Sequence, residues 1–222
     1  MKILEIITEA PLPPDWDHSV FTPNTSYKKK MDYAAFRAQK AGKGSSRTAF
    51  IIEHEGRPTV LKVAHNAKGM AQNYEEARIL DDSYIESLGI TVPMIDYDDK
   101  HNEPVWIHLE KAEKVNEKTL VNLMKCGNLT LLINLAANLA NTRGATLSYK
   151  ETIDVLKSDR FKYTDQDLKI CQQYAYNLSD LATNFNVGLM DLSRPANWGL
   201  YNGNPVVIDV GYTDAVHRAH YM

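Results

Sequence analysis

Three side chains that offer oxygen ligands follow short apolar stretches near the end of the sequence: Asp191, Asn197 and Asp209. Asp191 comes after the largely apolar residues 187–190, which we predict as a strand, and Asp209 comes after the β-branched run 206–208. Carboxylate and amide oxygens on short, stiff supports are ligands that Mg²⁺ prefers, together with phosphate oxygens. If the two strands are neighbours, the sequence predicts a site for magnesium and phosphate at their ends.

A hairpin turn is the element that would bring these residues together. Asn202 and Gly203 stand between apolar residues on both sides, and an Asn-Gly pair in that setting is a strong signal for a two-residue turn. This stretch taken alone also fits an ordinary β-hairpin whose polar residues only cap turns. The choice between the two depends on the rest of the chain.

A lysine inside a predicted strand is the next candidate. Residues 59–64 form a β-branched and apolar run with Lys62 in its middle, so the ammonium would be half-buried and would need an anionic partner. Glu75 and Glu76, in the helical composition of residues 72–80, are available shortly afterwards. Each residue alone has a simpler interpretation, as an edge-strand lysine facing water or as a charge on a helix surface. Their combination favours a pair.

Two glycines precede this strand. Gly42 and Gly44 flank a single residue, and Ser45 and Ser46 follow them. A glycine loop between strands lets backbone N–H groups approach phosphate oxygens, because no Cβ stands in the way. The Gly-x-Gly spacing is by itself a weak signal.

The order of these features resembles the protein-kinase superfamily. A glycine loop, a strand lysine, a helix glutamate, two more strands, helices and an Asp/Asn/Asp cluster follow one another over residues 42–211. The resemblance implies that Asp191 is the catalytic aspartate, which positions or deprotonates the acceptor hydroxyl. It implies that Asn197 and Asp209 hold Mg²⁺.

The same resemblance assigns residues to ATP. Lys62 would hold the α- and β-phosphates, and Glu76, preferred to Glu75, would fix the lysine rotamer. Arg194 would neutralise the transferring phosphoryl group in place of the catalytic-loop lysine. The remaining contacts would come from the glycine loop and from the hinge that presents backbone groups to adenine: Gly42, Gly44, Ser45, Ser46, Glu110 and Ala112.

The chain departs from the family pattern in three places. Five residues separate Asp191 from Asn197 where the kinase motif has four, so the turn is expected to bulge. Leu189 and Met190 stand where His-Arg usually precedes the aspartate. Eleven residues follow Gly211, so no activation segment is expected.

The predicted fold class is α+β, a bilobed protein-kinase-like fold with a small antiparallel-sheet N-lobe and a truncated helical C-lobe, and with ATP and Mg²⁺ between them. The expected domains are an N-terminal arm at 1–40, an N-lobe at 41–111 and a C-lobe with the catalytic-loop hairpin at 112–222. Further strands are expected at 92–98 and 104–110, and helices at 32–39 (one turn), 116–125, 128–143 and from Thr164 onward. The spacing Thr164-x-x-Asp167 predicts a capping box at the start of the last of these helices. Prolines and lysines within 11–30 predict an extended arm, which either docks a partner or lies on the surface of its own domain.

Composition limits the class of protein. The 222 residues are 44% hydrophobic and carry a net charge of −3, so the basic excess typical of nucleic-acid binding is missing. Cys126 and Cys171 lie far apart without a Cys-x-x-Cys pair, which argues against a zinc site or a disulfide framework and favours the cytoplasm. The N-terminal apolar run is interrupted by Glu5 and Glu9, and no apolar run reaches the roughly 18 residues of a membrane span. Neither a membrane nor nucleic acid is an expected partner.

The predicted function is ATP- and Mg²⁺-dependent phosphotransfer, with a protein Ser/Thr or the chain itself as the first acceptor to consider. Residues 60–76 in particular resemble small phage-encoded kinase-like proteins, which would place the protein in the host cytoplasm. Two alternatives stay open: a pseudokinase-like binding protein of a virion or host-interaction complex, and a small-molecule phosphotransferase. The sequence leaves the acceptor, any protein partner and the oligomeric state undetermined.

Overall fold

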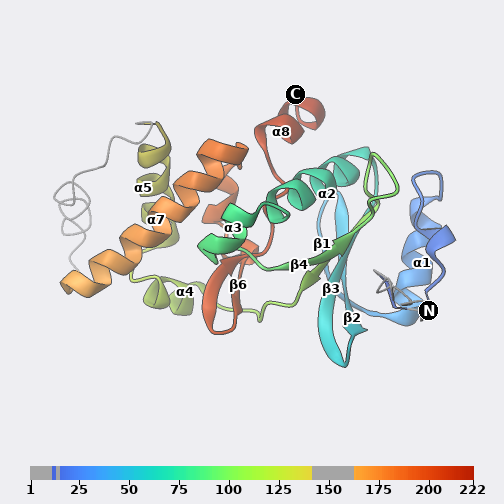
Figure 1. Ribbon diagram of the computed structural model, residues 1–222, viewed down its shortest axis with the longest axis horizontal. Coiled ribbons are helices and arrows are strands. Elements are labelled where there is room, and N and C mark those ends of the chain that lie inside the picture. Colours follow the sequence, from blue (N-terminus) through green and yellow to red (C-terminus); the bar gives the residue numbers. More distant parts are fainter. Residues whose placement is uncertain (1–11, 14–15, 142–162) are drawn as a thin grey trace, which may run out of the picture. The chain divides into compact units, whose positions relative to one another are not determined.

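The computed structural model describes residues 12–13, 16–141 and 163–222 (Figure 1). The chain divides into two compact units, one of Met1–Asn73 with Met94–Glu110 and one of Tyr74–Pro93 with Lys111–Met222. The first contains an antiparallel sheet and the second is mainly helical. The predicted α+β class is therefore confirmed.

A five-stranded antiparallel sheet forms the first unit, in the order β1-β2-β3-β5-β4. Its strands are β1 (Gln39–Lys43), β2 (Arg47–His54), β3 (Arg57–Ala64), β4 (Met94–Tyr97) and β5 (Trp106–Glu110). β2 and β3 are joined through Glu55 and Gly56, which both have positive φ, the backbone that a tight hairpin turn requires. Helix α1 (Tyr27–Arg37) precedes β1 in the sequence, and helix α2 (Ala67–Leu80) follows β3.

The N-terminal segment differs from the extended arm that was expected over 11–30. Helix α1 begins at Tyr27, five residues before the expected turn, and Ser26 caps it by accepting a hydrogen bond from the N–H of Lys29. Trp16 stacks on Phe21 at 5.6 Å between ring centroids. Buried apolar side chains of this segment join the core under the sheet: Leu12, Trp16, Val20 and Phe21. Apolar burial therefore outweighs the turn-forming prolines here.

Helices and one hairpin form the second unit. They are α3 (Ser83–Leu88), α4 (Glu117–Leu123), α5 (Leu129–Asn141), β6 (Trp198–Tyr201), β7 (Asn204–Val207), α7 (Asp165–Phe185) and α8 (Asp214–His220). The predicted capping box at the start of α7 is present, because Thr164 and Asp167 exchange hydrogen bonds. Helices α5 and α7 pack against each other along their apolar stripes (Figure 1).

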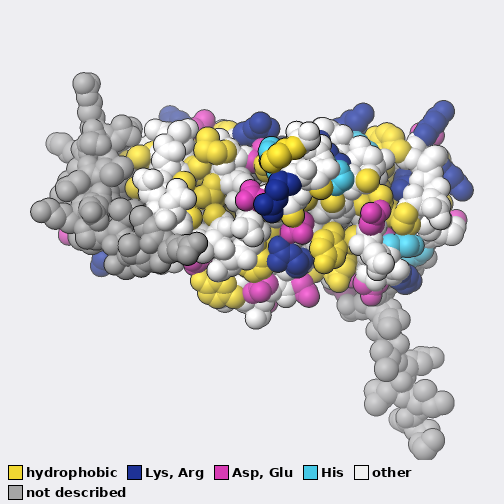
Figure 2. Space-filling model, turned by 90° about the horizontal axis from the view of Figure 1, so that it is seen from above, with side chains coloured by type: hydrophobic (Ala, Val, Ile, Leu, Met, Phe, Trp, Pro, Cys, Tyr) yellow, Lys and Arg dark blue, Asp and Glu magenta, His cyan; other side chains and the backbone are white. Residues whose placement is uncertain are grey.

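Both cysteines are buried in this helical core and form no disulfide. Burial raises the pKa of the Cys126 and Cys171 thiols to about 12. A protonated buried thiol is a poor nucleophile, so neither cysteine is a candidate for nucleophilic catalysis. None of the helices described is long and apolar enough to span a bilayer. Basic and acidic side chains are interspersed on the face that Figure 2 shows.

Candidate functional site

Asp191 lies in a 3₁₀ helix, η2 (Leu189–Ser193), and the strand predicted at 187–190 is wrong. The chain turns at Gly188, whose N–H donates to the carbonyl of Tyr212 at 2.9 Å and whose own carbonyl accepts from Asp191 N–H at 3.1 Å. A Cβ at Gly188 would lie 2.8 Å from the Tyr212 ring. Val187 and Leu189 are buried although they lie in a tight turn, and Met190 is 68% exposed. Periodicity over four residues does not distinguish such a turn from a strand.

The longer spacing between Asp191 and Asn197 is taken up by two consecutive turns. The second, η3 (Pro195–Asn197), begins at a proline, whose fixed φ favours the first position of a helical turn. Asn197 Nδ2 donates to the main-chain oxygen and to Oδ2 of Asp191, both at 2.8 Å. Because both amide hydrogens are directed to Asp191, Oδ1 is the atom of Asn197 that can bind a cation.

Arg194 contacts the other oxygen of the same carboxylate. Its Nη1 lies 3.4 Å from Asp191 Oδ1, and its side chain is 74% exposed. An ion pair this exposed contributes little to stability, so the guanidinium is able to leave Asp191 for another anion.

The predicted hairpin carries Asp209 back toward Asn197. Asn202 and Gly203 have φ of 49° and 80°, the positive values of the two-residue turn predicted from the Asn-Gly pair. Past the end of β7, the N–H of Ile208 donates to the carbonyl of Asn197 at 2.9 Å. Asp209 is the next residue, so the hairpin brings together the ends of the chain segments that carry Asp191, Asn197 and Asp209.

Buried contacts hold this loop and hairpin. Trp198 Nε1 donates to the carbonyl of Leu192 at 2.7 Å. Leu200 and Glu113 exchange backbone hydrogen bonds at 2.8 and 2.9 Å, which brings the predicted hinge residue Ala112 against β6. A Cβ at Gly199 would lie 2.7 Å from that of Ala112, so only glycine permits this approach.

The donor atoms suit magnesium better than a metal held entirely by protein. The described residues contain no cluster of three His, Cys, Asp or Glu side chains that could hold a metal. Asn197 Oδ1 and the Asp209 carboxylate are hard oxygen donors. Mg²⁺ is bound by one or two such groups and takes its other ligands from water and substrate phosphates, so these two residues fit it.

In the first unit, Lys62 lies on a central strand. β3 runs between β2 and β5, where Lys62 pairs with Ala49 and Ile107, and only 9% of the lysine is exposed. The alternative of an edge-strand lysine facing water is therefore wrong. A buried ammonium is stable only with anionic or hydrogen-bonding neighbours.

The two glutamates of α2 differ in environment. Glu76 is completely buried. Glu75 makes an ion pair at 2.8 Å with Arg78, whose side chain is 42% exposed. Helix α2 begins at Ala67, five residues before the predicted start. Glu76 is therefore the more deeply buried of the two glutamates, and its functional role stays a prediction.

The glycine loop is shorter than predicted. Gly42 lies within β1 and pairs with Ala49, so it is not part of the turn. The turn consists of Gly44, Ser45 and Ser46, and Gly44 N–H donates to the carbonyl of Arg47 at 2.9 Å. A β-bulge between Lys40 and Gly42 shifts the register by one residue, which local spacing does not reveal.

Two polar partners of this turn, Gln72 and Asn73, were missed by sequence analysis. Ser46 is buried and donates its hydroxyl hydrogen to Gln72 of α2. Arg47 is also buried and donates to Asn73 at 3.2 Å. Polar residues on a predicted helix are normally solvated, so nothing in the sequence marks Gln72 or Asn73 as buried.

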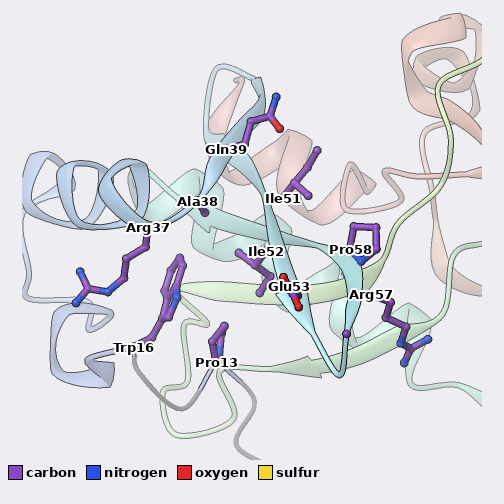
Figure 3. Close-up of a pocket in the computed structure, with 11 residues that line it drawn as sticks. Pro13, Trp16, Arg37, Ala38, Gln39, Ile51, Ile52, Glu53, Arg57 and Pro58 are labelled. Carbon is purple, nitrogen blue, oxygen red and sulfur yellow. The ribbon is translucent and has the colours of Figure 1, made fainter.

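A cavity of about 520 Å³ lies elsewhere in the first unit, with Trp16, Ile52 and Pro58 among the side chains around it (Figure 3). None of the predicted site residues lines it. The hinge candidate Glu110 is engaged nearby, because its carboxylate binds Arg57 at 2.6 Å. The predicted role of Glu110 involves only its backbone, which this ion pair leaves available.

No protein-family model and no curated protein matches the chain. Among solved structures, aminoglycoside phosphotransferase APH(4)-Ia is 14% identical, over 83% of this chain and 70% of that chain, with a TM-score of 0.33. A thermostable mutant of the same enzyme, in a ternary complex with AMP-PNP and hygromycin B, is 15% identical over 79% of this chain and 66% of that chain, with a TM-score of 0.32. The chain thus spans about two thirds of the length of these neighbours, and the likeness is too low to transfer an activity to it.

Proposed function

We propose that the chain is an ATP- and Mg²⁺-dependent phosphotransferase of protein-kinase-like type. The observation that carries the proposal is the arrangement of Asp191, Asn197 and Asp209. Asp191 accepts two hydrogen bonds from the side-chain amide of Asn197, which leaves Oδ1 of Asn197 for a cation. The backbone hydrogen bond from Ile208 to Asn197 brings the next residue, Asp209, to the same end of the hairpin, and its carboxylate is the second oxygen ligand. A hairpin whose polar residues only cap turns does not require the side-chain amide of Asn197 to be held by the Asp191 carboxylate.

In the proposed reaction an acceptor hydroxyl attacks the γ-phosphorus of ATP, and the bond to the β-phosphate oxygen breaks to release ADP. Asp191 orients the hydroxyl and takes its proton. Arg194 leaves Oδ1 of Asp191 and turns to the transferring group, which its exposure allows. Asn197 and Asp209 hold the Mg²⁺, whose charge offsets that of the phosphates.

Residues of β3, α2 and the β1–β2 turn supply the rest of the proposed nucleotide contacts. Lys62 provides a positive charge for the α- and β-phosphates, and Glu76 orients it. Within the described part of the chain, the backbone N–H groups of Ser45 and Ser46 have no hydrogen-bond acceptor, which makes them available for phosphate oxygens.

The acceptor is proposed only as a hydroxyl. A protein Ser/Thr or the chain itself is the first acceptor to test, and a small molecule is the second. A binding protein that keeps the site without transfer, and a phage origin with action in the host cytoplasm, both rest on the sequence resemblance alone.

Two substitutions separate nucleotide binding from transfer. Asp209→Asn should weaken Mg²⁺-dependent ATP binding, because it removes a charged metal ligand. Asp191→Asn should leave binding within about twofold and lower transfer by roughly 10²–10⁴-fold, the usual contribution of a general base. Binding is measured by calorimetry, and transfer by incorporation of label from [γ-³²P]ATP.

Asp99→Asn is the matched control, because this exposed carboxylate in the turn after β4 has no proposed role. It should change neither binding nor transfer. Label incorporation that survives Asp191→Asn would show that the assigned base is wrong.

A further inference from the structure

The turn between β1 and β2 is held by contacts beyond those that close it. Closure itself needs only the hydrogen bond from Gly44 N–H to the carbonyl of Arg47. Ser46 makes two more. Its carbonyl accepts from the N–H of His65 at 2.8 Å, and its buried hydroxyl donates to Gln72 of α2. The turn is thereby tied to the end of β3 and to the first half of α2.

Gly69 makes this approach of the helix possible. A Cβ at Gly69 would lie 2.2 Å from the carbonyl oxygen of Ser46 and 3.1 Å from the Cβ of Ala64. The carbonyl oxygen is a backbone atom, so it cannot rotate away as a side-chain end would. Alanine is the better residue in a helix interior, so the close packing of the turn explains a glycine at this position.

Two further side chains hold the flanks of the turn. Nε2 of His65 lies 2.6 Å from the hydroxyl of Thr48, and His65 also forms a hydrogen bond with the backbone of Ser45. Arg47 donates to Asn73 at 3.2 Å, and Asn73 donates in turn to the carbonyl of Pro104 at 3.0 Å. β3, α2 and the segment before β5 therefore all contribute, and all of these residues belong to one compact unit.

These contacts use the carbonyl and hydroxyl of Ser46 but not the N–H groups of Ser45 and Ser46. We infer that Gly69 and Gln72 are positioning residues that hold the β1–β2 turn in the conformation that offers those two N–H groups to a phosphate. The phosphate part of this inference rests on the proposed function. The restraint of the β1–β2 turn by Gly69 and Gln72 does not rest on the proposed function, and it is measurable without nucleotide.

Amide hydrogen exchange in the nucleotide-free protein tests the restraint. Gln72→Leu removes the acceptor of the Ser46 hydroxyl, so the amides of Gly44 and His65 should exchange at least tenfold faster relative to the amide of Leu61. Thr59→Val is the matched control. It removes another buried hydroxyl, bonded to His108 at 2.7 Å at the opposite end of β3.

The control should lower stability without changing the relative exchange of these amides. Equal acceleration in both variants, or no acceleration in Gln72→Leu, would overturn the inference. Gly69→Ala should accelerate exchange at the same two amides although it improves helix propensity. If Gly69→Ala does not fold, the Gln72 variant decides.

Kinetics test the positioning of phosphate. Gln72→Leu should raise the KM for ATP about tenfold and leave kcat within about twofold, because a loosened turn weakens binding in the ground and transition states alike. Thr59→Val should change neither. Ser46→Ala should raise KM similarly, and the double variant should be no worse than either single one, since both changes break one hydrogen bond.

Faster exchange together with an unchanged KM would overturn the positioning role. Failure of the unaltered protein to bind Mg-ATP would overturn the proposed function and the phosphate role together. In that case the exchange data still decide separately whether Gly69 and Gln72 restrain the turn.

Discussion

Neighbouring residues of the same type have different roles in this protein, and burial is what separates them. Glu75 and Glu76 are adjacent, yet one is in a surface ion pair with Arg78 and the other is fully buried. A buried carboxylate is tolerated only when its surroundings compensate the cost of desolvation. The sequence resemblance favoured Glu76, and burial distinguishes it from Glu75, but its functional role stays a prediction.

Glu76→Ala should therefore lower the free energy of unfolding by about 3 kcal/mol, in the range for breaking a buried charged interaction. Glu75→Ala should change it by less than about 1 kcal/mol, since its ion pair with the partly exposed Arg78 has the i, i+3 spacing of helix pairs that contribute little. Urea denaturation of the nucleotide-free proteins measures both values. A similar loss of unfolding free energy in the two variants would contradict the assignment of Glu76, and not Glu75, as the glutamate with buried partners.

His65 should make the first unit sensitive to mild acid. Burial lowers the pKa of its imidazole from the ordinary 6.5, and the positive charges of Lys43 and Lys40 lower it further. The unfolded chain then binds a proton at a higher pH than the folded chain does. Stability from this residue is complete above about pH 6.5 and is lost as the pH falls toward the folded-state pKa.

A comparison with His65→Gln isolates this effect from the titration of carboxylates. The unfolding free energy of the natural protein, measured between pH 8 and pH 5, should fall more steeply below pH 6.5 than that of the variant. The ring of Tyr27 lies 4.2 Å from that of His65, and the hydroxyl of Thr48 contacts its Nε2, so both side chains also face the imidazole. Parallel pH profiles for the two proteins would refute the prediction.

At the scale of elements, the turn of the β6–β7 hairpin needs a glycine because of its backbone conformation and not because a Cβ would collide with a neighbour. Gly203 and Gly42 both have room for a Cβ, but only Gly203 has a positive φ, of 80°. Gly203→Ala should cost about 1 kcal/mol of unfolding free energy, because a left-handed backbone disfavours a side chain. Gly42→Ala, in β1, should cost nothing measurable or stabilise slightly. Thermal denaturation of the two variants, side by side, is sufficient.

Elements with strong local signals were predicted well, and those with weak signals were not. The helix from Thr164 onward has a capping box and a long apolar stripe, and both are present in α7. Residues 187–190 offered only a short apolar run. In the structure Val187 forms an isolated β-bridge with Thr213, and Leu189 begins the 3₁₀ helix η2. The run 11–30 has prolines and lysines, yet its few large apolar residues enter the core. Their burial depends on a sheet that lies elsewhere in the chain.

At the scale of the whole molecule, the proposed function predicts stabilisation by Mg-ATP. A ligand that binds only the folded state adds about 2.7 kcal/mol at a hundredfold excess over its Kd. For a chain of this length that corresponds to a rise in melting temperature of about 5–10 °C. Mg²⁺ alone, and Mg-ATP with Asp209→Asn, should give much smaller shifts. An unchanged melting temperature at millimolar Mg-ATP would exclude both transfer proposals and leave the binding-protein alternative.

The sequence by itself determined the order of the candidate site residues along the chain. It also determined those turns, helix ends and strands that depend on neighbouring residues alone. The Asn202-Gly203 turn, the capping box at Thr164 and the strand around Lys62 depend on residues only a few positions apart. Short-range steric and hydrogen-bonding preferences act in any surroundings, so they can be predicted without knowing the rest of the fold.

Only the tertiary structure decided which polar groups are buried and what they contact. Ser46 and Gln72 are 26 positions apart, and so are Arg47 and Asn73. The neighbouring sequence does not distinguish Gln72 from a solvent-exposed helix residue. It also does not distinguish Gly69 from a glycine that merely lowers helix propensity. Burial and hydrogen-bond satisfaction arise when distant segments pack together, and the cost of an unsatisfied buried group then makes those partners specific.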